Sequence, residues 1–185
     1  MELLIKKARK GDKESFIKLI DGYMIQMYKV AKTRLKNEED IGDAIQETIL
    51  SAFTGIKDLR NTKYFNTWII KILINKCNDI IAKNKIVYIE SYDEIKNQEL
   101  KLYISDDIDS KIDFDNMLEI LSQEYRTVVV MYYVNRLTTK EIGNILNEKE
   151  GTIKSRLSRA KQKLKMYYVN TNTENSKLEG RINEI

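Results

Sequence analysis

Several residue types that carry chemistry or interrupt helices are absent or scarce in this chain of 185 residues. It has no proline and no histidine, one cysteine and seven glycines. A single cysteine, Cys77, excludes a disulfide within the chain, and without histidine the usual zinc-finger ligand sets cannot be assembled. Free cysteines are mostly buried, so we expect Cys77 in the core. The lack of proline and the scarcity of glycine remove the turns expected between many short strands and favour helices.

Long apolar runs are also missing. The first residues, MELLIKKARKGD, are charged from position 2 and lack the apolar segment of a signal peptide. No stretch approaches the roughly 20 apolar residues that cross a bilayer. We therefore expect a cytoplasmic protein with no direct membrane insertion.

Charge of both signs is present but unevenly distributed. The net charge is only +4, yet residues 90–115 hold nine acids and three bases, whereas residues 149–165 hold seven bases and one acid. An acidic middle followed by a basic end indicates a polyanionic partner for the end of the chain. Complementing a helix dipole is the alternative use of such cations.

The first half shows apolar residues at helical spacing. The pattern runs from Leu3 to Arg9, breaks at Gly11, resumes on one face from Phe16 to Ala31, and meets a polar turn at residues 37–40. In the next predicted helix, one side is apolar and the opposite side carries Asp43, Gln46, Glu47 and Leu50. Leu50 interrupts a polar face, which is either a single exposed leucine or part of a partner site.

A further helix is predicted from about residue 64 to residue 85. Phe65, Trp68 and the isoleucines after them form a broad apolar side, and Lys71, Asn75, Asn78 and Lys85 share a polar stripe. Aromatic residues beside a basic loop also suit the binding of unstacked bases.

The chain divides into two predicted helical domains. Residues 1–86 form the first, 87–116 an acidic flexible linker, 117–169 the second, and 170–185 a mobile tail. The β-branched run VVVMYYV would suit a strand, but its neighbours keep helical spacing from a cap at Ser122, so we expect a helix. The fold class is therefore all-α, with two small helical domains, the second containing a helix-turn-helix.

The helix-turn-helix is predicted from the segment that follows Leu137. Thr138 and Glu141 make a capping box for a short helix, Asn147 can adopt the left-handed turn that ends it, and a basic helix follows. On that second helix, Ile153, Leu157, Ala160 and Leu164 share one narrow sector. Ser155, Ser158, Arg159 and Gln162 lie opposite, flanked by Lys154, Lys161 and Lys165 on one side and by Arg156 and Lys163 on the other. This layout fits a helix in a DNA major groove.

Three segments resemble the extracytoplasmic-function sigma factors, the promoter-specificity subunits of bacterial RNA polymerase. The stretch LSQEYRTVVVMYYVNRLTTKEIGNILNEKEGTIKSRLSRAKQKL is similar to the family's fourth conserved region, which usually ends close to GTVKSRLSRAR. DIGDAIQETILSAF resembles DAEDLVQETFLRAW, and FNTWIIKILINKCNDIIAK resembles FxxWLYRIAxNxxxDxxRR. The resemblance covers about three quarters of the chain. The family's pattern differs at Gly42, Ala82, Ser122 and Asn147.

The resemblance implies partners and site residues. It assigns Asp43, Gln46, Glu47 and Leu50 to the docking of core RNA polymerase. It assigns the −10 promoter element to Asn61, Lys63, Tyr64, Trp68, Lys71, Asn75 and Asn78. It assigns the −35 element to Thr152, Lys154, Ser155, Arg156, Ser158, Arg159 and Lys163. It further implies an anti-sigma factor, often membrane-bound, and no catalytic residue, metal or cofactor.

Two other functions fit parts of the sequence. A free-standing helix-turn-helix regulator would bind duplex DNA alone and would leave residues 40–85 without a role. A metal-dependent nuclease would use Asp40, Asp43 and Glu47, but no further acid or histidine at a defined spacing completes such a site.

Overall fold

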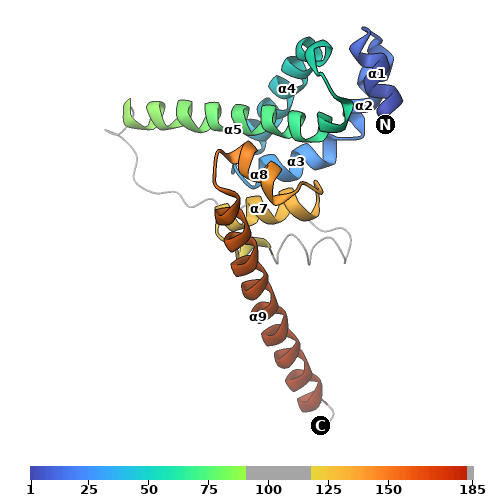
Figure 1. Cartoon of the computed structure of the whole chain (residues 1–185). Coiled ribbons are helices and arrows are strands. Elements are labelled where there is room, and N and C mark those ends of the chain that lie inside the picture. The colour runs from blue at the N-terminus through green and yellow to red at the C-terminus, as the bar shows by residue number, and fades with distance from the viewer. Residues whose placement is uncertain (91–117, 183–185) are drawn as a thin grey trace.

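The computed structural model describes residues 1–90 and 118–182, and all regular secondary structure in these ranges is helical. The α-helices are α1 (Glu2–Arg9), α2 (Lys13–Asp21), α3 (Met24–Lys32), α4 (Glu38–Gly55), α5 (Phe65–Glu90), α7 (Gln123–Tyr133), α8 (Thr139–Leu146) and α9 (Glu150–Ile182) (Figure 1). Two 3-10 turns, η1 (Ile56–Asp58) and η2 (Thr62–Tyr64), connect α4 to α5. The predicted all-α class is confirmed.

Side-chain caps set where the helices of the first half begin. Asp12 accepts a hydrogen bond of 3.0 Å from the backbone N–H of Ser15 at the start of α2. Asn37 accepts one of 2.9 Å from the N–H of Glu39 at the start of α4. The polar turn predicted at residues 37–40 was wrong beyond Asn37, because its three acids form the first turn of α4, where they complement the helix dipole.

The apolar face predicted from Phe16 to Ala31 belongs to two helices rather than one. Gly22 and Tyr23 separate α2 from α3, so the chain changes direction in the middle of the pattern. Phe16 in α2 and Ala31 in α3 are nevertheless both buried. The spacing identified the buried residues correctly, but it did not reveal the break between the helices.

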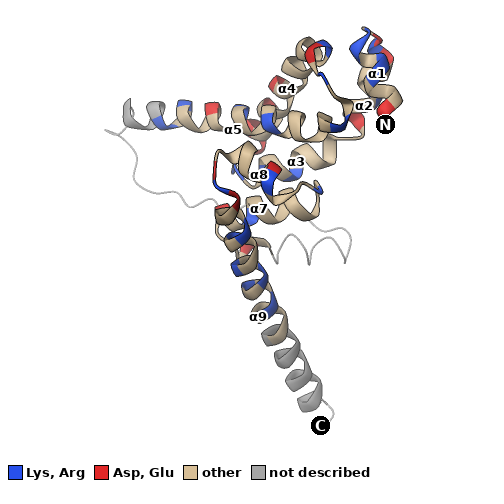
Figure 2. Cartoon of the chain, in the orientation of Figure 1, with Lys and Arg blue, Asp and Glu red and all other residues tan. Residues whose placement is uncertain are grey.

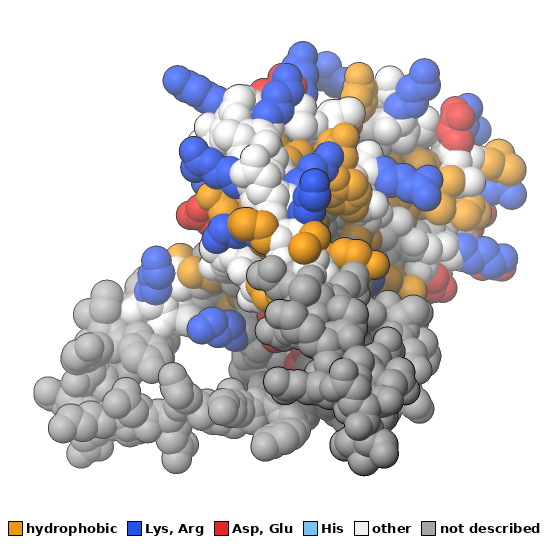
Figure 3. All heavy atoms as spheres, turned by 90° about the horizontal axis from the view of Figure 1, so that it is seen from below, with side chains coloured by type: hydrophobic (Ala, Val, Ile, Leu, Met, Phe, Trp, Pro, Cys, Tyr) orange, Lys and Arg blue, Asp and Glu red, His pale blue; other side chains and the backbone are white. Residues whose placement is uncertain are grey.

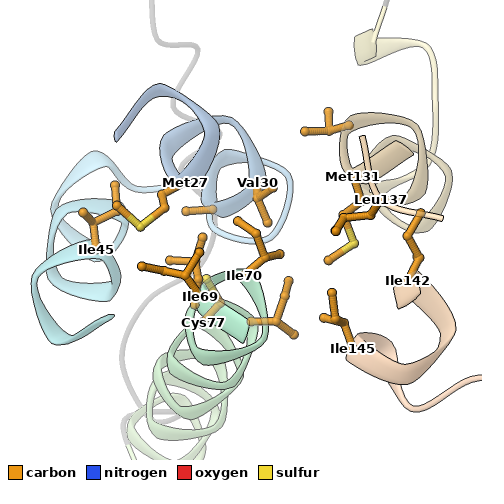
Figure 4. Packing of buried hydrophobic residues seen from close by; sticks show 14 of the residues in the cluster. Met27, Val30, Ile45, Ile69, Ile70, Cys77, Met131, Leu137, Ile142 and Ile145 are labelled. Atoms are coloured by element: carbon orange, nitrogen blue, oxygen red, sulfur yellow. The ribbon is translucent and has the colours of Figure 1, made fainter. Parts of the chain in front are cut away.

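The core is continuous between the first half (residues 1–90) and the second half (residues 118–182). In Figure 4, Val30 and Ile70 of the first half lie on the side that faces Met131 and Ile145 of the second. Cys77 is buried in this cluster, as predicted, and burial raises the pKa of its thiol to about 11. One apolar cluster therefore stabilises both halves together.

Polar contacts also cross between the halves. The Thr127 hydroxyl donates to the Thr33 hydroxyl over 3.0 Å in a buried setting. Asn66 Nδ2 donates to the backbone oxygen of Asn135 over 2.7 Å, and Thr67 Oγ1 donates to Glu141 Oε1 over 2.7 Å. α5 thus packs against α8, and α3 against α7. The two predicted domains form a closed arrangement here.

Helices α5 and α9 both extend beyond the predicted limits. α5 continues to Glu90, four residues past the expected end of the first domain, and the rest of the predicted linker lies outside the described residues. α9 runs to Ile182 and projects away from the other helices (Figure 1). The predicted tail thus continues α9 as helix through residue 182. Its mobility, like the three predicted boundaries between the segments of the chain, stays a prediction.

Candidate nucleic-acid and protein interfaces

The predicted helix-turn-helix is formed by α8, a short turn and α9. The capping box is present: the Glu141 backbone N–H donates to the Thr138 hydroxyl, and the Glu141 carboxylate accepts from the Thr138 N–H at 2.9 Å. Asn147 ends α8 with φ 57° and ψ 44°, the left-handed conformation expected of it. These local signals in the sequence correctly placed both ends of α8.

Gly143 lets the turn approach α8 closely, and the sequence analysis did not single it out. A Cβ built on Gly143 would lie 2.8 Å from the backbone oxygen of Glu148. The backbone N–H of Glu148 also donates to the carbonyl of Gly143 over 2.9 Å. Any larger residue at position 143 therefore forces the turn away from α8. A glycine in the middle of a predicted helix was the available signal.

The predicted sidedness of α9 is present in the structure. Ile153, Leu157 and Ala160 are buried and Leu164 is half-buried against the other helices. The opposite side is exposed, including Thr152, Lys154, Ser155, Ser158, Arg159 and Lys163. Figure 2 shows Lys and Arg along α9 from its first turns. Figure 3, viewed from the side toward which α9 projects, shows many basic and few acidic side chains. The polar and basic side chains opposite the buried sector of α9 are thus open to solvent.

Arg156 differs from the other predicted DNA-contacting residues of α9. Its side chain is only 19% exposed, and its guanidinium pairs with Glu148 at 2.8 Å and with Glu124 at 3.6 Å. These contacts join α9 to the turn before it and to α7. Lys154, in contrast, is well exposed and pairs with Glu150 one turn earlier, at 2.9 Å. Arg156 therefore has a structural role in this conformation, which the sequence analysis missed.

Two lysines of α9 lie over tyrosine rings of α7. Lys161 Nζ is 5.8 Å from the centre of the Tyr133 ring, and Lys163 Nζ is 5.5 Å from that of Tyr125. A hydrogen bond with Tyr133 raises the pKa of Lys161 above its ordinary value. These cation–π contacts place one lysine from each basic flank of α9 against α7.

The polar face of α4 is exposed, as the sequence predicts. Asp43, Gln46, Glu47 and Leu50 all face solvent, and Leu50 is 61% exposed. Phe53, which the sequence analysis missed, lies one turn further along and is 48% exposed, with its ring edge against Phe16. The spacing of three residues between Leu50 and Phe53, which places both on one face of a helix, was the signal in the sequence. Two large apolar side chains beside acids form a surface suited to a protein partner.

The turn before α5 and one side of α5 form a third candidate surface. Asn61 caps η2 by accepting from the N–H of Lys63, and Tyr64 is 59% exposed. Trp68 is half-buried and packs against Phe65, with ring centres 5.7 Å apart. The predicted polar residues Lys71, Asn75 and Asn78 are exposed on α5. An exposed tyrosine, a partly exposed tryptophan and a polar stripe thus lie along one stretch of chain.

Two of the three acids considered for a nuclease site, Asp40 and Glu47, have separate partners. Asp40 accepts a hydrogen bond from Asn84 at 3.0 Å, and Glu47 pairs with Lys76 at 3.3 Å. Within residues 1–90 and 118–182, no group of three or more metal-ligating side chains of His, Cys, Asp or Glu comes together. No described helix is long and apolar enough to cross a membrane.

Comparisons with known proteins match both halves of the chain. The family described as "Sigma-70 region 2" matches residues 19–86, and "Sigma-70, region 4" matches residues 111–164. The chain is 29% identical over 181 residues to the ECF RNA polymerase sigma factor SigW of Bacillus subtilis, covering 89% of this chain and 97% of that protein. It is 27% identical to RNA polymerase sigma factor SigV of the same organism, covering 83% and 91%.

Two solved structures have the same fold. CnrH, solved in complex with the cytosolic domain of CnrY, matches with a TM-score of 0.61 at 19% identity, covering 91% of this chain and 97% of CnrH. The sigma factor RpoE of Bartonella quintana, solved with the anti-sigma factor NepR, matches with a TM-score of 0.65 at 19% identity, covering 85% and 96%.

Proposed function

Because this chain belongs to the sigma-70 family, in its extracytoplasmic-function group, we propose that three separate surfaces carry out its work in starting transcription. It is an alternative sigma factor, which binds core RNA polymerase and directs initiation at specific promoters. The chemistry of RNA synthesis belongs to the polymerase, so the chain needs no catalytic residue, metal or cofactor of its own. A cytoplasmic location follows from this partner.

The exposed side of α9 is the proposed surface for the −35 element. Ser155, Ser158 and Arg159 face away from the core, where their hydrogen-bonding groups can meet base edges. Lys154 and Lys163 lie on the two flanks, where they can meet phosphates of both strands, and Thr152 lies at the N-terminal end. Arg156 contributes to this surface by holding α9 against Glu148 and Glu124.

The η2 turn and α5 form the proposed surface for the −10 element. Promoter opening exposes unstacked bases, which bind to aromatic rings and to polar side chains that can reach a base edge. Tyr64 and Trp68 supply the rings, and Asn61 and Lys63 shape the turn beside them. Lys71, Asn75 and Asn78 continue the surface along α5.

The exposed side of α4 is the proposed docking surface for core polymerase. Asp43, Gln46 and Glu47 supply polar contacts, and Leu50 with Phe53 supplies apolar area for burial. We also propose regulation by an anti-sigma factor, either free or membrane-anchored. Its support is that solved structures with this fold were obtained with bound partner proteins.

The observation that carries this proposal is the combination of a helix-turn-helix with a separate exposed acidic and apolar face on α4. A free-standing regulator would have no use for that second surface. The test is transcription from a genomic fragment library with purified core polymerase of the source organism. We expect discrete start sites only when the chain is added. Their absence would contradict the proposed function.

The same assay tests the docking surface. Changing Asp43→Ala together with Glu47→Ala should abolish binding to core polymerase and initiation, because both acids are exposed on α4. The matched control, Glu14→Ala with Asp21→Ala on α2, makes the same change in charge and should leave both unchanged. Normal core binding by the α4 variant would place the docking surface elsewhere.

A further inference from the structure

A cavity of about 490 Å³ lies where the two halves meet. It lies among the end of α3, the start of α4 and the last turns of α5 on one side, and the first turns of α7 on the other. Its volume is in the range of small-molecule sites. None of the three proposed surfaces includes it, although Asn78 of the −10 surface is bonded to one of its lining residues, Arg34.

The charge around this cavity is strongly one-sided. Its charged lining residues are five cations and one acid: Lys32, Arg34, Lys36, Lys85, Arg126 and Asp40. Among the described residues, no ion pair uses any of the five cations. The acid is already engaged, because Asp40 accepts a hydrogen bond from Asn84 at 3.0 Å. We call these five cations the seam cations.

Both arginines of the seam have unused donor capacity. Arg34 Nη2 donates to Asn78 Oδ1 at 2.6 Å, and Arg126 Nη2 donates to the backbone oxygens of Leu121 and Glu119. The Nε of each guanidinium is enclosed and meets no acceptor. A guanidinium binds phosphate best with two parallel N–H groups, and each of these arginines has N–H groups beyond those used in the hydrogen bonds above.

Closure of the two halves itself concentrates this charge. Arg126 comes from the second half, whereas the other four seam cations come from the first. Bringing like charges together in a partly enclosed space is unfavourable, since the Coulomb energy rises as the local dielectric constant falls. A compact multivalent anion that contacts both halves would reverse that cost and favour the closed arrangement.

We propose that this seam cavity binds a small molecule carrying a diphosphate or triphosphate group. Leu35 and Ile81 give the cavity an apolar wall beside the cations, which would suit the organic part of such a ligand. Because residues of both halves line the site, the bound ligand stabilises the closed arrangement. This inference does not rest on the proposed function, since it concerns the chain without polymerase or DNA.

Calorimetric titration of the full chain with inorganic pyrophosphate, triphosphate and ADP tests the site, at constant ionic strength. We expect saturable binding of one equivalent. Tighter binding of ADP than of pyrophosphate would show that the site also contacts the nucleoside part of its ligand. The double change Lys32→Gln and Lys36→Gln should weaken binding at least about tenfold, because two charged hydrogen-bond donors are lost. Thermal unfolding without ligand checks that the variant is folded.

The matched control is Lys10→Gln with Lys13→Gln, which removes the same charge from exposed positions just after α1 and at the start of α2. Its dissociation constant for the ligand should stay within about twofold of that of the unchanged chain, because the two charges it removes are exposed and screened by salt. Equal weakening in both variants would show non-specific attraction and overturn the site. Absence of saturable binding would also overturn the site. Binding that appears only after the acids of residues 91–115 are neutralised would overturn it as well, because the chain's own carboxylates would then be the occupant.

Discussion

At the scale of single residues, Gly143 fixes how closely the turn of the helix-turn-helix approaches α8. A methyl group there would lie 2.8 Å from the Glu148 backbone oxygen, so Gly143→Ala forces backbone atoms apart. We expect a loss of about 1–3 kcal/mol in the free energy of unfolding, measured by urea denaturation. Gly151→Ala is the control, because nothing lies within 4 Å of its added Cβ. It should gain up to about 1 kcal/mol from helix propensity. Equal effects would contradict the close approach.

Arg159 and Lys163 should affect promoter binding differently. Arg159 lies on the outward strip, so Arg159→Ala should cost about 1–3 kcal/mol only at promoters with the preferred base at one −35 position. Lys163 lies on the flank, over the Tyr125 ring, so Lys163→Ala should weaken all −35 sequences equally and lower the salt slope by about one. The measurement is holoenzyme binding to a set of −35 variants at several salt concentrations. Uniform losses for both variants would remove this distinction.

At the scale of helices, Glu141 links the start of α8 to α5. Burial raises the pKa of its carboxyl, but hydrogen bonds from Thr67 and Thr138 outweigh this and lower the pKa below its ordinary value. A lowered pKa means that the stabilisation is complete above about pH 4.5 and is lost as the pH falls through the folded-state pKa. Glu141→Gln should therefore reduce stability at pH 7, and the difference should shrink toward pH 3.

Denaturation of both chains between pH 3 and pH 7 measures this linkage. The control is Glu119→Gln, which removes an exposed carboxylate before α7 and should give a small difference at every pH. A Glu141→Gln difference that does not change with pH would mean that the carboxylate charge has no part in the cap.

Local patterns predicted most helices, and the reasons are visible in individual cases. The run from Val128 to Val134 forms the end of α7 and its C-cap, because apolar spacing toward the core outweighed β-branched propensity. Ser122 precedes that helix as expected, although its side chain makes no capping bond. The break at Gly22 was missed because no residue there enforces it, since its φ of −65° is ordinary for any residue. Only packing of α3 against α4 and α5 requires the change of direction.

At the scale of the whole molecule, the packing of one half against the other was not predictable from periodic patterns. Thr33 and Thr127 are 94 positions apart. Thr33 lies at the end of α3 and Thr127 lies within α7, and the sequence of neither helix indicates that it needs the other. A hydroxyl on an apolar face does not identify its partner. For the same reason, the seam cations come from three separate segments, at residues 32–36, 85 and 126, and form no motif in the sequence.

We expect the two halves to separate when the chain binds a promoter. Elements named −35 and −10 are about 25 base pairs apart, or roughly 85 Å along B-DNA. The helices that carry the two proposed surfaces, α5 and α9, are packed together through α8, which contacts both of them. Helices in contact lie only about 8–10 Å apart, so the two surfaces cannot span that distance until the halves separate.

Thr127→Val tests this opening, because at nearly constant volume it removes the hydroxyl that lies 3.0 Å from the Thr33 hydroxyl across the halves and 2.8 Å from the Gln123 carbonyl oxygen within α7. The Thr33 hydroxyl keeps its bond to Val30. A loss of about 1 kcal/mol would favour the open form about fivefold. Energy transfer between dyes on Ile25→Cys and Gln162→Cys measures the separation, since buried Cys77 resists labelling. Thr48→Val, whose hydroxyl bonds only within α4, is the control and should leave transfer unchanged. If transfer falls equally in both variants, or in neither, the hydrogen bond between Thr127 and Thr33 does not hold the halves together.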